Sequence, residues 1–128
     1  MKTYKCEKSY ESLEKLILDK DIQAVAIFTP APDHVRHAVA ALKAGKHVLS
    51  AVPAAMSLDE CEQLIETVKQ TGLTYMMAET SYFQQPTVSA RAFFKEGRFG
   101  NLFYTESEYH HPGLDSLFFE NGQKTWRH

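Results

Sequence analysis

Short apolar runs alternate along this chain with longer segments that carry one apolar stripe, and this alternation constrains the fold more than any other feature. The run from Ala24 to Phe28 has no polar residue between its apolar ones, which is typical of a strand buried on both faces of a sheet. His47 to Ser50 and Leu73 to Ala78 are similar runs. Because parallel strands are joined by crossover helices, the pattern predicts a doubly wound α/β domain with a parallel sheet.

The segments between these runs have the spacing and the end signals of helices. Asp33 to Ala44 has apolar residues on one helical face, and Gly45 follows it as the residue that ends the helix. Ser57 and Glu60 form the capping-box pattern that opens another helix. Further elements are predicted at both ends of the chain: a helix capped by Ser9, a helix from Pro86 to near Gly97, and a strand from Asn101 to Tyr109.

Length and charge exclude several classes of protein. The 128 residues are enough for one compact domain, so a second domain can be present only in part. A formal charge of -2 gives no basic excess, so no nucleic acid is expected as a partner. The apolar runs are far shorter than the roughly 20 residues of a membrane helix, so no membrane is expected either. The two cysteines form no CxxC pair or framework, which favours a reducing compartment and predicts a cytoplasmic protein.

The carboxyl ends of the predicted strands are where an open α/β sheet binds its ligands. In this chain those ends carry the sequences TPAPDH from Thr29, SAVPAA from Ser50 and AETSYF from Ala78. Because the carboxyl ends of parallel strands meet at one edge of the sheet, we expect the three turns to line one crevice.

Three stretches of the chain resemble the Gfo/Idh/MocA family, named after glucose-fructose oxidoreductase and inositol dehydrogenase. They are DIQAVAIFTPAPDH at 21–34, ALKAGKHVL at 41–49 and KEGRFGN at 95–101. The resemblance covers nearly the whole chain and implies an oxidoreductase that uses NAD or NADP on a sugar, a polyol or a related hydroxyl compound. It implies that residues 1–100 are the C-terminal part of a Rossmann-like parallel sheet, and that residues 101–128 begin the α/β substrate domain with its first strand.

One departure from the family pattern concerns the glycine turn. The family begins with a strand, a GxGxxG-type turn and a helix whose N-terminus holds the pyrophosphate, and no segment of this chain corresponds to them. We therefore expect an internal fragment or truncated product of a longer enzyme, inactive by itself. A noncatalytic remnant that only oligomerises is an alternative.

The other departure is at the turn after the second strand. Most of the family carries Glu-Lys-Pro there, and the lysine reaches substrate and cofactor, whereas this chain has Ala51, Val52 and Pro53. A minority of relatives with Val-Pro-Ala-Ala at this turn includes the branch with NAD-dependent glycosidase activity. A glycosidase-like mechanism of transient oxidation and elimination is therefore the alternative to a simple dehydrogenase.

The resemblance implies cofactor contacts at the strand ends. The predicted cofactor-binding residues are Thr29, Pro30, His34, Ala51, Val52, Pro53 and Glu79. Thr29 as a mere strand-end cap and Glu79 facing bulk water are the alternatives. His34 and His37 have a spacing that suits a metal, but no third ligand is spaced to join them, so no metal is expected.

Acid/base chemistry must then come from another part of the chain, because a general acid or base contributes roughly 10²- to 10⁴-fold to a rate. On the predicted last strand Glu106, Glu108 and His110 share one face, and His111 lies on the other. His110 and His111 are the predicted catalytic residues, with a solvated strand face as the alternative. The same strand is expected to pair with another copy and so to form a homo-oligomer.

Overall fold

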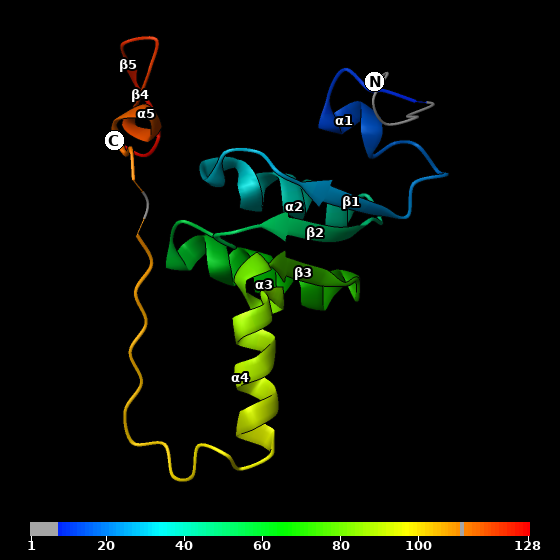
Figure 1. The fold of residues 1–128 in the computed structure, drawn as a ribbon. Coiled ribbons are helices and arrows are strands. Elements are labelled where there is room, and N and C mark those ends of the chain that lie inside the picture. Colours follow the sequence, from blue (N-terminus) through cyan, green and yellow to red (C-terminus); the bar gives the residue numbers. More distant parts are fainter. Residues whose placement is uncertain (1–7, 111) are drawn as a thin grey trace. The chain divides into compact units, whose positions relative to one another are not determined.

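The computed structural model of the chain describes residues 8–110 and 112–128 (Figure 1). They form two compact units, which divide between Ala78 and Glu79. The first unit contains a parallel three-stranded sheet in the order β1-β2-β3. Its strands are β1 at Ala24–Ile27, β2 at His47–Ala51 and β3 at Tyr75–Ala78. The predicted parallel sheet is confirmed, and each strand lies within one or two residues of its expected bounds.

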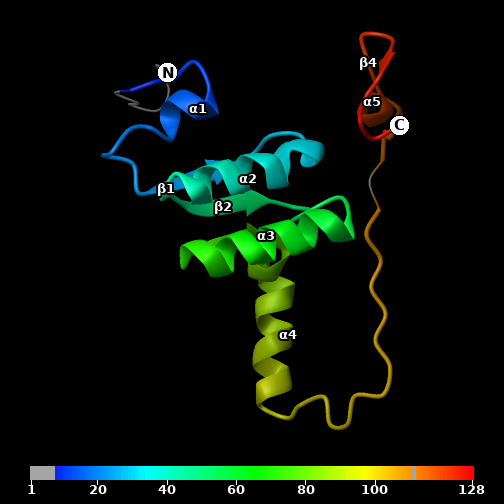
Figure 2. The ribbon, with the colours of Figure 1, turned by 180° about the vertical axis from the view of Figure 1, so that it is seen from behind.

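The helices α2 (His34–Lys43) and α3 (Leu58–Thr71) lie on the same face of this sheet (Figure 2). Side chains on alternate strand positions, such as Val25, Ile27 and Val48, are buried against them. The residues of the core share apolar character and come from both layers: Val25, Ile27, Val35, Ala38, Val39, Ala41, Leu42, Val48 and Leu64. The predicted apolar stripe of α2 therefore forms the centre of the core.

The predicted capping box at the start of α3 is present in a shifted form. The Glu60 backbone N–H donates to Ser57 Oγ at 3.2 Å, as the pattern requires. The Glu60 carboxylate, however, accepts from the backbone N–H of Met56 at 2.7 Å, one residue before the cap. At the other end, Gly72 has a φ of 66°, the left-handed conformation that ends a helix at a glycine.

The first predicted helix is shorter than expected. α1 is a single turn, Leu13–Leu16, and its cap is Ser12, whose side chain accepts from the backbone N–H of Lys15. The prediction of Ser9 as the cap is wrong. Tyr10 lies before the helix, and its hydroxyl donates to the Asp19 carboxylate, which ties this part of the chain to the loop before β1.

The second unit has less regular structure. It contains α4 (Gln85–Lys95), the 3₁₀ turn η2 (Thr80–Phe83) and the short helix α5 (Asp115–Phe118). β4 (Phe119–Glu120) and β5 (Gln123–Lys124) form an antiparallel hairpin. α4 confirms the helix predicted from Pro86 to near Gly97. No helix in the described residues is both long and apolar enough to cross a bilayer.

The strand predicted from Asn101 to Tyr109 is wrong for this structure, in which these residues pair with no other strand of the described chain. A strand needs a neighbour to bond its backbone groups, and alternation along a sequence indicates faces but supplies no neighbour. Pairing with another copy stays a prediction. The predicted domain boundary after residue 100 also stays a prediction, because the division after Ala78 reflects compactness alone.

A buried lysine ties together the amino-terminal ends of β1 and β2. Lys46 is only 7% exposed, and its Nζ donates to the carbonyl oxygens of Asp19 at 2.7 Å and Ile22 at 2.8 Å. The Asp19 carboxylate accepts from the Tyr10 hydroxyl, the Asp21 backbone N–H and Lys8, and these bonds lower the pKa of Asp19. The loop before β1 is thus held by charge-assisted bonds on both its backbone and its side chains.

Replacing Lys46 by Met should lower the free energy of unfolding by about 3 to 6 kcal/mol, because it removes two bonds to a charged donor, which contribute about 1.5 to 3 kcal/mol each. Urea denaturation followed by circular dichroism measures the change. Lys43→Met, at an exposed position in the last turn of α2, is the matched control and should change stability little. Equal effects of the two substitutions would contradict the role given to Lys46.

Candidate functional site

Two of the predicted strand ends meet at one edge of the sheet. In the parallel register Ile27 lies beside Ser50, so the chain leaves β1 toward Thr29 next to the place where it leaves β2 toward Pro53. The third strand joins in the same direction, with Ala78 beside Ala51. Glu79 follows it in the sequence but belongs to the second unit. The first unit therefore brings together the turns after β1 and β2.

The turn after β1 leads directly into α2. Asp33 donates its backbone N–H to Pro30 O at 2.9 Å, which closes the 3₁₀ turn η1 (Ala31–Asp33) in front of the helix. Thr29 is exposed, and its hydroxyl lies 3.1 Å from His37 Nδ1. Burial is the main cause that lowers the pKa of His37, and the neighbouring Arg36 lowers it further. The neutral His37 ring can therefore accept from the Thr29 hydroxyl at neutral pH.

The turn after β2 presents an uncharged surface. Ser50 is fully buried, Ala51 is half-buried, and Val52 is 44% exposed. The peptide bond between Val52 and Pro53 is cis. An apolar surface of this kind can pack against a flat aromatic ring but can neither donate nor accept a proton. The structure thus places Ala51, Val52 and Pro53 where a contact surface is available and acid/base chemistry is not.

His34 lies between the two turns rather than at the surface. Its ring is only 2% exposed, with Nε2 2.8 Å from Thr29 O and Nδ1 2.7 Å from Pro53 O. The cofactor contact predicted for His34 is not tested by this structure, but both ring nitrogens face carbonyl oxygens of the protein. His34 therefore connects two segments that were each predicted to bind the cofactor.

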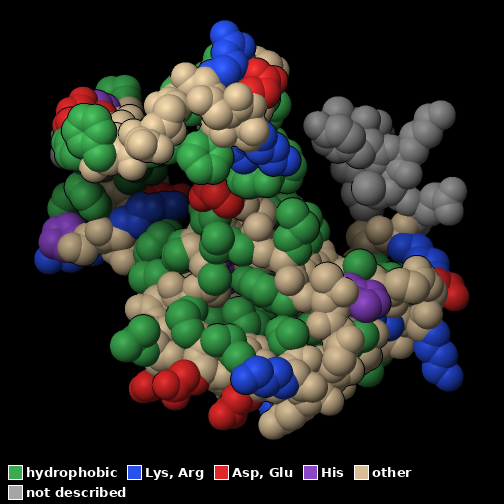
Figure 3. Space-filling model, turned by 90° about the horizontal axis from the view of Figure 1, so that it is seen from below, with side chains coloured by type: hydrophobic (Ala, Val, Ile, Leu, Met, Phe, Trp, Pro, Cys, Tyr) green, Lys and Arg blue, Asp and Glu red, His purple; other side chains and the backbone are tan. Residues whose placement is uncertain are grey.

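A groove of about 700 Å³ runs along β1 and reaches the Thr29 turn. Its floor includes the consecutive residues 25–29, and its rim carries Arg36 and His37 from α2 and Tyr10 and Glu14 from the segment around α1. Hydrophobic side chains, green in Figure 3, are also exposed on the side of the molecule that this view shows. The groove therefore places the side chains of Arg36 and His37 next to the Thr29 turn.

Glu79 in the second unit is used as a cap. Its carboxylate accepts from the backbone N–H of Ser81 at 2.8 Å, and hydrogen bonds from Ser81 lower the pKa of Glu79. The side chain is exposed. A contact between Glu79 and a cofactor stays a prediction.

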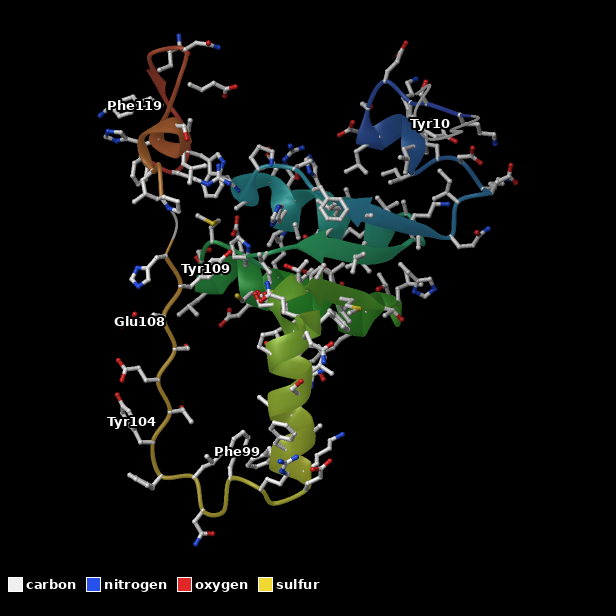
Figure 4. The ribbon with its side chains drawn as sticks, in the orientation of Figure 1. Tyr10, Phe99, Tyr104, Glu108, Tyr109 and Phe119 are labelled. Carbon is white, nitrogen blue, oxygen red and sulfur yellow. The ribbon has the colours of Figure 1, made fainter. Side chains whose placement is uncertain are left out.

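Of the predicted acid/base residues, His110 lies in the segment after α4. His110 Nε2 is 3.2 Å from the Glu108 carboxylate, and the Tyr104 hydroxyl donates to Glu106 at 2.8 Å. Tyr104 and Glu108 project from this segment in Figure 4. His111 lies outside the described residues. A catalytic role for either histidine stays a prediction, and within the described chain no three His, Cys, Asp or Glu side chains are grouped to hold a metal.

Sequence reasoning missed two features of this edge. His37 was considered only as a metal ligand, although its position one turn into the helix after Thr29 brings its ring back to the strand end. The shared use of His34 by both turns has no signal in the sequence, because its partners are backbone carbonyls. A spacing pattern reports side chains and gives no information on such partners.

The residues at this edge fit one half of a dinucleotide. The uncharged surface of Val52 and Pro53 and the exposed hydroxyl of Thr29 suit a nicotinamide ring and its ribose. A pyrophosphate needs backbone N–H groups of a glycine turn that opens a helix. All six glycines are in the described part of the chain, and none of them lies between a strand end and the helix that follows it.

The chain is similar in sequence and in structure to several known proteins. A family model described as "Oxidoreductase family, NAD-binding Rossmann fold" matches residues 1–79. A "Glycosyl hydrolase family 109 protein" of Solibacter usitatus is 34% identical over 116 residues, which are 91% of this chain and 26% of that protein. An "Alpha-N-acetylgalactosaminidase" of Shewanella oneidensis is 32% identical over 100 residues, 78% of this chain and 22% of its own length.

A crystal structure of scyllo-inositol dehydrogenase from Lactobacillus casei, with bound NAD(H) and scyllo-inositol, is similar with a TM-score of 0.66. The two chains are 26% identical, and the match covers 71% of this chain and 27% of the dehydrogenase. The chain thus spans about a quarter of the length of the proteins that it matches.

The burial of His37, which lowers its pKa, predicts a pH dependence of stability. Because the folded state lowers the pKa of His37 below its usual value of about 6.5, the unfolded chain binds more protons near and below that pH. The stabilising contribution is therefore present above about pH 6.5 and is lost as the pH falls through the lowered pKa of the folded state.

His37→Asn should flatten this loss between about pH 7 and pH 5, which urea titrations at several pH values measure. His128→Gln, in the second unit, is the control and should leave the slope unchanged. An unchanged slope for His37→Asn would show that His37 titrates alike in the folded and unfolded states.

Proposed function

This chain belongs to the Gfo/Idh/MocA oxidoreductase family with an NAD-binding Rossmann fold, and we propose that it supplies the nicotinamide side of the cofactor site in an enzyme of sugars or polyols. The observation that carries the proposal is the meeting of two parallel strand ends at an uncharged, accessible turn. Ligands of open α/β sheets bind at such ends. The family match supports NAD as the cofactor class, and NADP is the variant that the same surface can also accept.

A nicotinamide coenzyme held at this edge would supply hydride-transfer chemistry at the carbon that bears the substrate hydroxyl. The residues of this chain have the remaining tasks. Val52 and Pro53 form a surface for the ring, and the Thr29 hydroxyl, held by His37, is a hydrogen-bonding group beside it. The proton that leaves the substrate hydroxyl needs a base, which the turn at Ala51 to Pro53 does not contain.

A glycosidase-like reaction is a second candidate function, and a specific observation favours it. The turn after β2 has no lysine, and the relatives with the names of glycosidases match most of this chain. In this reaction a sugar hydroxyl is oxidised transiently, the neighbouring C–H is deprotonated, the glycosidic bond breaks by elimination, water adds, and the hydride returns to the sugar. No net NADH is then produced, which separates it from a dehydrogenase.

We further propose that the segment from Asn101 to Tyr109 associates with another copy of the chain. Phe103 in this segment is 98% exposed, and Leu102 before it is 50% exposed. Exposed apolar side chains on an extended segment outside a sheet favour association with another chain. Light scattering of the purified chain tests this, and a monomer at high micromolar concentration would contradict it.

The chain alone should bind NADH too weakly for ordinary assays. Losing several hydrogen bonds to the pyrophosphate, at about 1.5 to 3 kcal/mol each, moves a micromolar site beyond millimolar. Calorimetric titration with NADH and NADPH measures this. Adding a separate polypeptide with the family's glycine-turn unit should restore binding, and micromolar binding by the chain alone would contradict the proposed division of the site.

The acid/base assignment is testable in a full-length enzyme that contains this chain. Replacing both His110 and His111 by Ala should lower the rate by roughly 10²-fold or more, whereas Val52→Ala should change it only a few-fold. The readouts are NADH formation with a polyol and release of nitrophenol from a nitrophenyl α-N-acetylgalactosaminide without net NADH. Small, equal effects of the two changes would remove the histidines from the mechanism.

A further inference from the structure

α4 is a helix that buries none of its residues within the described chain. It has 11 residues, and isolated helices shorter than about 12 to 15 residues are marginal in water. Within its own unit, the Arg91 guanidinium lies 3.6 Å from the centre of the Tyr82 ring, and the ring of Phe99, labelled in Figure 4, lies 6.2 Å from that of Phe93. These contacts leave the helix without a buried face, so α4 needs a further partner.

A groove of about 560 Å³ lies between α4 and the segment that follows it. Phe94 on α4 and Phe99 and Leu102 beyond it form its apolar part, and these side chains are 59%, 47% and 50% exposed. An exposed apolar groove of this kind suits the apolar face of a helix. The second unit thus presents both an unpartnered helix and a groove that a helix can enter.

The two sides of this groove carry opposite charges. α4 contributes Arg91 and Lys95, and the following segment contributes Glu106. Within the described residues Lys95 and Glu106 form no ion pair with each other, and the Glu106 carboxylate accepts from the Tyr104 hydroxyl at 2.8 Å. A surface with one basic side and one acidic side is complementary to a copy of itself that is turned by 180°. The charges therefore favour a second copy of the chain as the partner.

We propose that two copies of the chain associate about a two-fold axis, each placing α4 in the groove of the other. In this arrangement Lys95 of each copy faces Glu106 of the other copy, and Phe94 and Leu102 of both copies form a shared apolar centre. The inference rests on the association proposed above for the segment from Asn101 to Tyr109, and it deepens that proposal by naming α4 as the element that the segment meets. It is independent of the nicotinamide site, whose two turns belong to the first unit.

Exchanging the two charges tests the arrangement in the full chain, with sedimentation velocity at low ionic strength as the measurement. Lys95→Glu and Glu106→Lys should each weaken association at least about tenfold, because each replaces two attractions by two repulsions in a symmetrical dimer. An equimolar mixture of the two variants should associate nearly as tightly as the unsubstituted chain, since each mixed dimer contains only opposite pairs. Lys43→Glu, at an exposed position of α2, is the control for net charge and should have little effect.

A second pair of variants tests the apolar centre. Phe94→Ser should weaken association at least about tenfold, because the dimer no longer buries an aromatic side chain there. Leu18→Ser is the matched control, since Leu18 is 73% exposed and belongs to the first unit. It should leave association unchanged. Equal effects of the two substitutions would contradict the placement of α4 in the groove.

The remaining outcomes separate this arrangement from other modes of association. If the variants with exchanged charges associate as tightly as the unsubstituted chain, the segment meets another surface and the inference is wrong, although the association itself stands. Recovery in the double variant Lys95→Glu with Glu106→Lys, without recovery in the mixture, would show that the two residues pair within one chain and would also overturn it. A monomeric unsubstituted chain at high micromolar concentration would overturn both this inference and the association on which it rests, and the titrations with NADH would still decide the proposed cofactor site.

Discussion

Parallel pairing of β1 with β2 is the constraint on which the first unit depends. It places the amino-terminal ends of the two strands at one edge of the sheet and their carboxyl ends at the opposite edge. At the amino edge, Lys46 donates to two carbonyl oxygens of the loop before β1. At the carboxyl edge, His34 reaches one carbonyl of each turn. Both groups are buried, and each bonds a segment that is distant in the sequence, so these hydrogen bonds connect the loop before β1 to β2 and the turn after β1 to the turn after β2.

The elements of the first unit were predictable because their patterns are local. An apolar run such as Ala24 to Phe28 is buried when the next element along the chain packs against it, and the same holds for the apolar stripe of α2. The segment 101–109 was also predicted as a strand, yet it forms none in the described chain. A β-strand forms only when a neighbouring strand bonds its backbone, and the residues of the segment do not specify that neighbour. The prediction was therefore wrong for a reason that the sequence of the segment does not contain.

The candidate site was predictable in its place and less so in its contacts. The family's strand-end turns came together at Thr29 and Pro53, as parallel strands require. The cofactor contact expected for His34 stays a prediction, and the sequence did not indicate that both nitrogens of its ring face backbone oxygens. The contact of His37 with Thr29 depends on how the helix returns over the strand end. These details follow from tertiary packing, which residue types alone do not encode.

Ties to backbone carbonyls have an evolutionary consequence. Every residue type presents the same carbonyl, so the side chains at Asp19, Ile22 and Thr29 can be exchanged without loss of the bonds that Lys46 and His34 make. The neighbouring position 52 can likewise gain or lose a charged group while the turn around it stays in place. A lineage can therefore change the chemistry offered at this edge by single substitutions and keep the scaffold that presents it.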